Sequence, residues 1–82
     1  MKEGMHLKII SPEKLLFEGG ISRLLLPGSK GQFEVLNNHA PIISSLGGGD
    51  VIYTTDTKEE TSIPIQSGFV RVENNEIVLC IE

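Results

Sequence analysis

Aromatic residues and cysteine are scarce in this chain of 82 residues, which has no Trp, one Tyr, three Phe and one Cys. A single cysteine cannot form an intramolecular disulfide, and this excludes a secreted mini-protein held together by disulfides. Long apolar runs are also missing: runs such as Leu24–Leu26 are far shorter than the roughly 20 apolar residues that a membrane-spanning helix needs. We therefore expect a small core of Ile, Leu and Val, and membrane association only through a partner.

Positive charge is limited as well. Seven Lys and Arg residues against 11 Asp and Glu residues give a net charge of −4, and the basic residues are scattered singly. This pattern disfavours a nucleic-acid partner. Residues 1–6 contain neither an apolar signal core nor an Arg/Ser-rich transit segment, so we expect the chain to stay where it is made. The length suits one domain over residues 1–82.

Alternation of apolar and polar residues predicts strands rather than helices. Met5, Leu7 and Ile9 follow a two-residue period. Turn signals recur at intervals of roughly 8 to 12 residues, a pattern typical of a sandwich or barrel, so the predicted fold class is all-β. Within residues 21–26 the same period predicts one face with Ser22, Leu24 and Leu26, and the other with Ile21, Arg23 and Leu25.

Glycine, proline and asparagine indicate where these strands bend or end. Gly19–Gly20 predicts a bulge or sharp bend, and Pro64, which cannot donate to a ladder, predicts a strand at an edge or bulge. Asn74–Asn75 predicts a two-residue hairpin turn, because Asn readily adopts left-handed backbone angles. Ile42–Leu46 is compatible with either a short strand or a single helical turn.

Residues able to perform catalysis or to hold a metal are few. Ser11, His39 and Asp50 could compose a catalytic triad, but no Gly-x-Ser-x-Gly elbow marks the serine, so chance co-occurrence is the preferred interpretation. Cys80 lies within an apolar strand and is interpreted as a small buried apolar residue. Two separated His and one Cys do not supply the ligand spacing of a zinc site. We therefore expect no catalytic residue, no metal and no cofactor.

Two glycine-containing loops and one histidine allow more than one interpretation. Gly28–Gly31 has the Gly-x-x-Gly pattern of a KH nucleic-acid-binding loop, but it separates two predicted strands, so a turn is preferred. Gly47–Gly49 is interpreted as a turn, with the close approach of a partner's backbone as the alternative. His39 either braces its own loop through hydrogen bonds or faces a partner, and both interpretations remain open.

Four segments follow one another in a characteristic order: His6–Glu13, Leu26–Phe33, Asn38–Pro41 with its His-Ala-Pro sequence, and Ser67–Val72 with its Gly-Phe pair. Together they resemble the N-terminal domain of the ATP synthase epsilon subunit, called delta in mitochondria. The match covers almost the whole chain, and the order and spacing of the segments make it specific.

This resemblance implies a flattened β-sandwich of about ten strands in the central stalk of a proton-translocating ATP synthase. The domain would be non-catalytic and would rotate between its partners, the gamma subunit and the c-ring. Paired sheets suit that role because they resist deformation. The resemblance places Gly28, Ser29, Lys30, Gly31 and Gln32 toward the c-ring, and Ser11, His39, Pro41, Ile42 and Ile43 toward gamma. We expect an apolar patch for a permanent neighbour at Ile10, Ile43 and Ile52.

Many members of this family continue into a C-terminal hairpin of two helices, whereas this sequence ends at Glu82. In the family, that hairpin carries the inhibition of ATP hydrolysis and, in some members, ATP binding. We expect neither property, nor a helical hairpin, in this chain. The resemblance also implies a peripheral location on the cytoplasmic face of the bacterial inner membrane, with contact to the membrane only through the complex.

Two other all-β classes compete with this interpretation. A lipoyl- or biotinyl-carrier domain presents a modifiable lysine at a hairpin tip, and Lys30 and Lys58 are the candidates, but neither has the flanking Asp or Met of such domains. An OB-fold would need exposed aromatic residues and a basic groove, and one Tyr with three Phe is too few.

Overall fold

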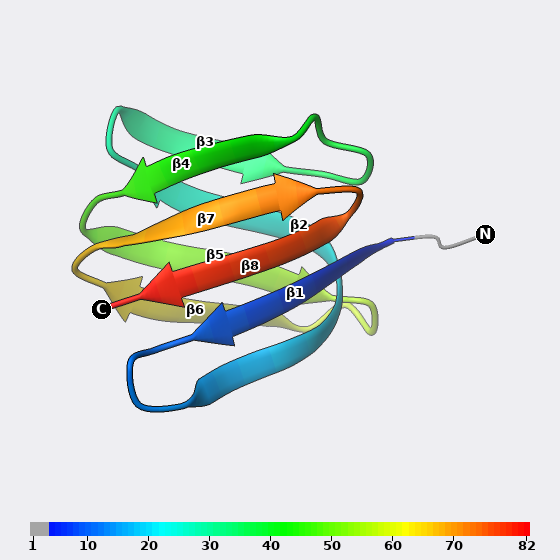
Figure 1. Ribbon diagram of the computed structural model, residues 1–82. Coiled ribbons are helices and arrows are strands. Elements are labelled where there is room, and N and C mark those ends of the chain that lie inside the picture. The colour runs from blue at the N-terminus through cyan, green and yellow to red at the C-terminus, as the bar shows by residue number, and fades with distance from the viewer. Residues whose placement is uncertain (1–3) are drawn as a thin grey trace.

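The computed structural model describes residues 4–82, which contain eight strands and no helix (Figure 1). The all-β prediction is confirmed, and these residues include no helix able to cross a membrane. About ten strands were expected; there are fewer partly because the runs on either side of Gly19–Gly20 form one uninterrupted strand of 14 residues. The strands are β1 (Met5–Ile10), β2 (Leu15–Gly28), β3 (Gly31–Val35), β4 (Ile42–Leu46), β5 (Gly49–Thr55), β6 (Glu60–Ile65), β7 (Gly68–Glu73) and β8 (Glu76–Ile81).

The strands form two packed layers that share β2, and together they make a β-sandwich (Figure 1). The front sheet consists of β4, β7, β8, β1 and the first half of β2, and the back sheet consists of β3, the second half of β2, β5 and β6. The pair β1–β8 is parallel, and the other pairs of the described strands are antiparallel.

The loops lie at two opposite ends of the sandwich (Figure 1). The turns after β1, β2, β4 and β6 lie at the left in this view, and we call this the Lys30 end, after the β2–β3 turn. The loops after β3, β5 and β7 lie at the right, and we call this the His39 end, after the β3–β4 loop.

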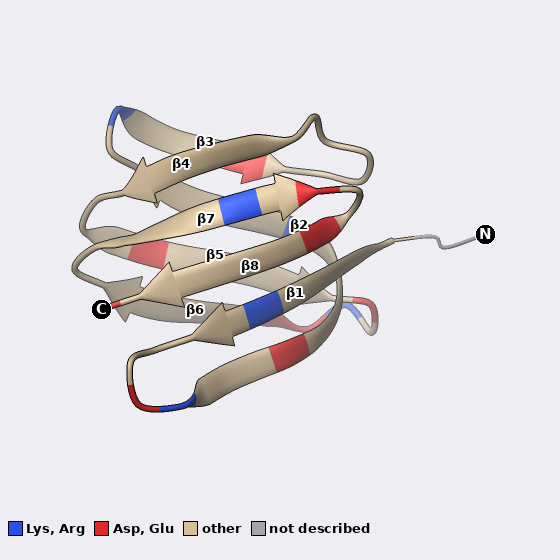
Figure 2. Ribbon diagram, viewed as in Figure 1, with Lys and Arg blue, Asp and Glu red and all other residues tan. Residues whose placement is uncertain are grey.

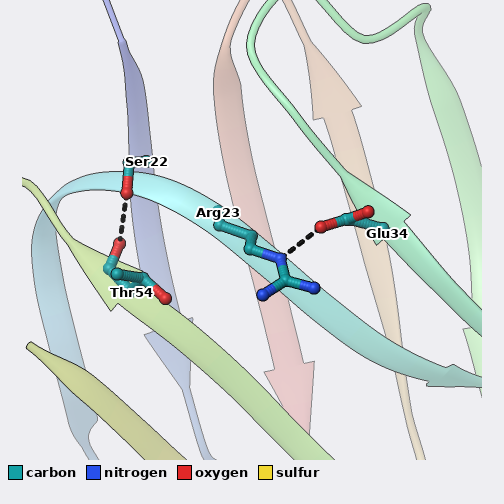
Figure 3. Close-up of polar contacts among 4 residues, drawn as sticks. All are labelled: Ser22, Arg23, Glu34 and Thr54. Carbon is teal, nitrogen blue, oxygen red and sulfur yellow. Dashed lines mark hydrogen bonds and ion pairs between the residues drawn. The ribbon is translucent and has the colours of Figure 1, made fainter. Parts of the chain in front are cut away.

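Strand β2 changes layers close to the glycines that predicted a bend. Gly19 and Gly20 still pair with β1, and from Ile21 onward the strand pairs with β5. The bulge falls just beyond them, between Ile21 and Arg23, where it turns both Ser22 and Arg23 outward. Ser22 Oγ donates to the Thr54 carbonyl of β5 at 3.4 Å, and Arg23 pairs with Glu34 of β3 (Figure 3).

The bulge also overturns one prediction about faces. Strict alternation placed Ile21 opposite Leu24 and Leu26, but all three side chains are fully buried. The extra residue in the bulge shifts the alternation by one position, so the residues before and after it point to the same side. The prediction that Ile21 faces away from Leu24 was therefore wrong.

The core between the layers is almost entirely aliphatic, as the composition predicted. No polar or charged residue is buried among residues 4–82, and Tyr53 is the only buried aromatic residue there. Its ring contacts that of the half-buried Phe17, with the centroids 4.5 Å apart. The buried residues are Met5, Leu7, Ile9, Ile21, Leu24, Leu26, Val35, Leu46, Val51, Tyr53, Ile65, Val70, Val72, Ile77, Leu79 and Ile81.

Three further predictions about strands and turns are confirmed or decided. Ile42–Leu46, which could have been a helical turn, is a strand paired with β7. Pro64 lies in β6, an edge strand of the back sheet. Asn74 and Asn75 have φ angles of 52° and 63°, so they form the predicted two-residue turn between β7 and β8.

Gly68, at the start of β7, supports a prediction about stability. A Cβ atom there would lie 2.4 Å from the Cys80 carbonyl oxygen, which belongs to the paired strand β8 and cannot move aside easily. We expect Gly68→Ala to lower the free energy of unfolding by about 1–3 kcal/mol, as overpacking does. Denaturant unfolding measures this, with Gly47→Ala as the control, because its nearest neighbour would be Ser29 Cα at 3.9 Å. Equal stability of the two variants would contradict the prediction.

Candidate partner-binding face

One row of outward side chains crosses the front sheet near the Lys30 end. The strand register aligns Ser45, Phe69, Cys80 and Ile10 across β4, β7, β8 and β1. Their neighbours along the strands, such as Leu79, are buried, so this row points away from the core. A groove of about 550 Å³ follows the row. We call these four residues the apolar row, because three of them, Phe69, Cys80 and Ile10, are apolar.

The next row of the same face joins apolar and charged residues. It consists of Ile43, Arg71, Val78 and Lys8, aligned across the same four strands. Ile43 is 78% exposed and lies beside the apolar row on β4. Figure 2 shows no charged residue on β4 or, near the Lys30 end, on β7 and β8, whereas charges lie further toward the His39 end, among them Arg71, the cross-strand neighbour of Ile43. Exposed Phe69 thus lies in a part of the front sheet that is free of charge, and exposed Ile43 lies at its border, beside Arg71.

Residues predicted to face the gamma subunit surround this surface. Ser11 lines the groove of the apolar row at the Lys30 end. Pro41 and Ile43 line a second groove, and His39 lines a third together with Pro41 at the His39 end. Ile42 is half-buried and packs against the core, so Ile43 supplies most of the exposed area of this pair. The structure therefore places Ile43 on this face and Ser11, His39 and Pro41 at its two ends.

The residues predicted to face the c-ring form the β2–β3 hairpin turn. Gly28 pairs with Gly31 across the turn, which confirms the turn interpretation of this Gly-x-x-Gly sequence, and Lys30 is exposed. Ser29 Oγ lies 2.9 Å from Ser45 Oγ, and the Ser29 N–H donates to the Ser45 carbonyl at 3.3 Å. Because Ser45 belongs to the apolar row, the turn is anchored directly to the candidate partner-binding face.

The loop that carries His39 is held by local hydrogen bonds. The His39 N–H donates to the Leu36 carbonyl at 3.1 Å and closes a turn, and His39 Nδ1 lies 2.7 Å from the Ala40 carbonyl oxygen. The Asn38 N–H donates to Asn75 Oδ1 at 2.7 Å. These contacts confirm that His39 braces its loop, and the ring also lines a polar groove of about 330 Å³.

Two expectations about apolar residues were wrong. Cys80 was expected inside the core, but it is only half-buried and points outward from β8, because Leu79 and Ile81 occupy the inward positions. Ile52 was grouped with Ile10 and Ile43 in one patch. It lies instead on β5 of the back sheet, where the buried Val51 and Tyr53 take the inward positions, so Ile52 faces away from the other two residues.

The residues considered for catalysis do not assemble. Ser11 follows β1 at the Lys30 end, whereas His39 precedes β4 at the opposite end (Figure 1). The Ser11 hydroxyl instead closes the turn after β1, where it accepts the Lys14 N–H at 3.2 Å. Among residues 4–82, no group of three or more His, Cys, Asp or Glu side chains could hold a metal ion.

The fold and this face define a small β-sandwich domain with exposed apolar side chains on one sheet. Residues 4–82 match the family model described as the β-sandwich domain of the ATP synthase delta/epsilon chain. The chain belongs to this family. It is 36% identical over 80 residues to the ATP synthase epsilon chain of Chlorobium limicola and 37% identical over 73 residues to that of Leptospira borgpetersenii.

The relatives differ in length. The match takes in 98% of this chain and 91% of the Chlorobium limicola protein, but 89% of this chain and 57% of the Leptospira borgpetersenii protein. Among solved structures, a chain of Euglena gracilis mitochondrial ATP synthase has the same fold with a TM-score of 0.91 at 14% identity; the match covers 99% of this chain and 52% of that one. A chain of the Tetrahymena thermophila central stalk and c-ring reaches 0.79 at 19% identity, over 98% of this chain and 64% of that one.

Sequence reasoning missed Phe69, Val78 and Cys80 as candidate contact residues. A signal for them was available, because β7 and β8 carry apolar residues in the phase opposite to Val70 and Leu79. A strand whose outward positions are also apolar is either covered on both faces or open to a partner.

Proposed function

We propose that this chain is a non-catalytic subunit of the central stalk of a proton-translocating ATP synthase, where it couples the gamma subunit to the c-ring. The observation that supports this proposal best is the exposure of large apolar side chains on a sandwich of the epsilon family: Phe69 of the apolar row is 51% exposed, and Ile43 is 78% exposed. In support, the Tetrahymena thermophila chain that shares this fold belongs to a central stalk and c-ring assembly. Residues 1–82 act as one domain in this role.

The gamma subunit binds the outer face of the front sheet in this proposal. Ser11 borders that face at the Lys30 end and His39 borders it at the other end, while Ile43 and Phe69 lie between them. Large apolar side chains near the centre of an interface, surrounded by polar ones, contribute most of the binding energy. The face has this arrangement.

The c-ring contacts the turn Gly28–Gln32. Its exposed Lys30 and Gln32 offer hydrogen-bond donors to polar loops, and Ser29 ties the turn to β4 through Ser45. A load on the turn therefore passes directly into the front sheet, which holds gamma. Two packed sheets with an aliphatic core transmit such a load with little deformation.

The proposed location follows from these partners. The domain lies at the membrane surface as a peripheral part of the complex, on the cytoplasmic face of the bacterial inner membrane. The c-ring supplies the contact to the membrane. The front sheet offers charges of both signs, from Arg71 and Lys8 to Glu73 and Glu76, and no basic stretch that would favour anionic lipid (Figure 2).

The carrier-domain alternative has limited support. Lys30 and Lys58 do lie in hairpin turns, at β2–β3 and β5–β6, as that alternative requires. The family assignment favours the stalk subunit instead. A mass increase on the intact protein from its native cells would revive the carrier interpretation.

Co-purification tests the proposal. We expect the tagged chain, expressed in its native cells and isolated at moderate salt, to bring down the gamma subunit and the c-ring. The apolar contacts proposed between gamma and the front sheet should persist at salt concentrations that screen exposed charges. Absence of both partners from the isolated material would overturn the proposed function.

A further inference from the structure

Two turns that are 37 residues apart in the sequence interlock at the His39 end. The Asn38 N–H donates to Asn75 Oδ1 at 2.7 Å, and Asn75 Nδ2 donates back to Asn38 Oδ1 at 3.3 Å. The Asn75 carbonyl accepts the His6 N–H of the front sheet at 2.8 Å. One asparagine thus connects the loop that carries His39 to the β7–β8 hairpin and to β1.

The backbone of each turn explains why these side chains meet. Asn38 has a φ angle of 67° as the third residue of the turn that the His39 N–H closes on Leu36. The N–H of the third residue takes no part in that closing hydrogen bond, and it needs a partner elsewhere if it is to be satisfied. Asn75 supplies this partner from its own left-handed position, at a φ angle of 63°.

We propose that Asn75 is a positioning residue, which holds the Asn38–Pro41 segment in the orientation that the gamma subunit binds. This inference rests on the proposed function, because it takes His39 and Pro41 as gamma contacts. Without the paired amides, the loop would be held by the Leu36–His39 turn and the short contact within His39–Ala40. Both are internal to the loop, so its direction relative to the front sheet would then be set mainly by the start of β4 at Ile42.

The two neighbouring asparagines offer a matched pair of variants. Glycine adopts positive φ angles readily, and Asn-Gly is a favoured sequence in this kind of hairpin turn, so Asn75→Gly keeps the turn and removes only the side chain that binds Asn38. Asn74→Gly makes the same chemical change one residue earlier, at a φ angle of 52°. We expect the melting temperatures of both variants to lie within about 3 °C of the unaltered chain.

Hydrogen exchange and affinity then report on positioning. We expect the Asn38 amide to exchange at least about ten times faster in Asn75→Gly and at its original rate in Asn74→Gly. Affinity for the cognate gamma subunit should fall about five- to tenfold in Asn75→Gly, the loss typical of one hydrogen bond, and should change less than about twofold in Asn74→Gly. Asn75→Asp keeps an acceptor for the Asn38 N–H and should restore most of the affinity.

Several results would overturn the inference. The unaltered chain already provides one test. If its Asn38 amide exchanges as fast as a fully exposed amide, the Asn38 N–H does not form the hydrogen bond to Asn75. Native affinity of Asn75→Gly, or equal losses in both glycine variants, would exclude a positioning role for the side chain. His39→Ala separates these results from a failure of the proposed function. If the proposed function fails, His39→Ala also binds gamma with native affinity. If only the positioning role of Asn75 fails, His39→Ala still weakens gamma binding.

Discussion

Ile43→Asp is expected to weaken binding of the gamma subunit by about 100-fold or more while leaving the domain folded. Ile43 is 78% exposed on β4, so the free domain loses almost no packing, and the free energy of unfolding should change by less than about 0.5 kcal/mol. In the complex, the carboxylate would be buried beside the apolar row, where the adjacent Arg71 already pairs with Glu73. An unpaired buried charge costs several kcal/mol, and about 2.7 kcal/mol already corresponds to 100-fold in affinity.

The measurement is titration calorimetry or surface binding with purified gamma, together with thermal unfolding of each variant. Ser62→Asp is the matched control, because Ser62 is exposed on β6 of the back sheet and the change adds the same charge. Similar affinity of both variants would mean that the front sheet is not the gamma-binding face. Unfolding of free Ile43→Asp would make Ile43 a structural residue instead.

The positions of most strands along the chain and the aliphatic nature of the core followed from the sequence, because they depend on local periodicity and on turn residues. Asn74–Asn75 and Pro64 lie where their backbone preferences predicted. The bulge after Ile21 could not be located, since Gly19–Gly20 marks a bend without showing which residue is added to the strand. That one residue decided which side of β2 carries Ile21.

The candidate face required knowledge of the pairing between distant strands. Cys80 and Phe69 adjoin Ile10 only because β1 pairs in parallel with β8, which lies at the other end of the chain. Periodicity shows that Ile52 and Ile43 each lie outward on a strand, but it does not show on which sheet. Assigning the two residues to one patch failed for this reason. The Asn38–Asn75 contact also had no signal in the sequence, because strand pairing brings together two turns that are distant along the chain.

Leu24 is a position at which a single substitution should cost the fold much stability, because β2 lies there between two other strands of the back sheet and faces the core. Its side chain is fully buried, and its backbone lies between Val35 of β3 and Tyr53 of β5. Leu24→Ala should lower the free energy of unfolding by about 2–5 kcal/mol through lost burial and the cavity left behind. A domain of this size has a total stability of roughly 4–12 kcal/mol, so much of the margin would be lost.

Leu25→Ala isolates the effect of burial, since the same side chain is truncated one position further along the same strand. Leu25 is half-buried and points outward, between Glu34 and Ile52, so its loss should cost less than about 1 kcal/mol. We expect thermal unfolding to show a fall of at least about 10 °C for Leu24→Ala and only a few degrees for Leu25→Ala. If both variants melted at the same temperature, burial of the Leu24 side chain between the layers would not stabilise the sandwich, and the stiffness proposed for the stalk would need another origin.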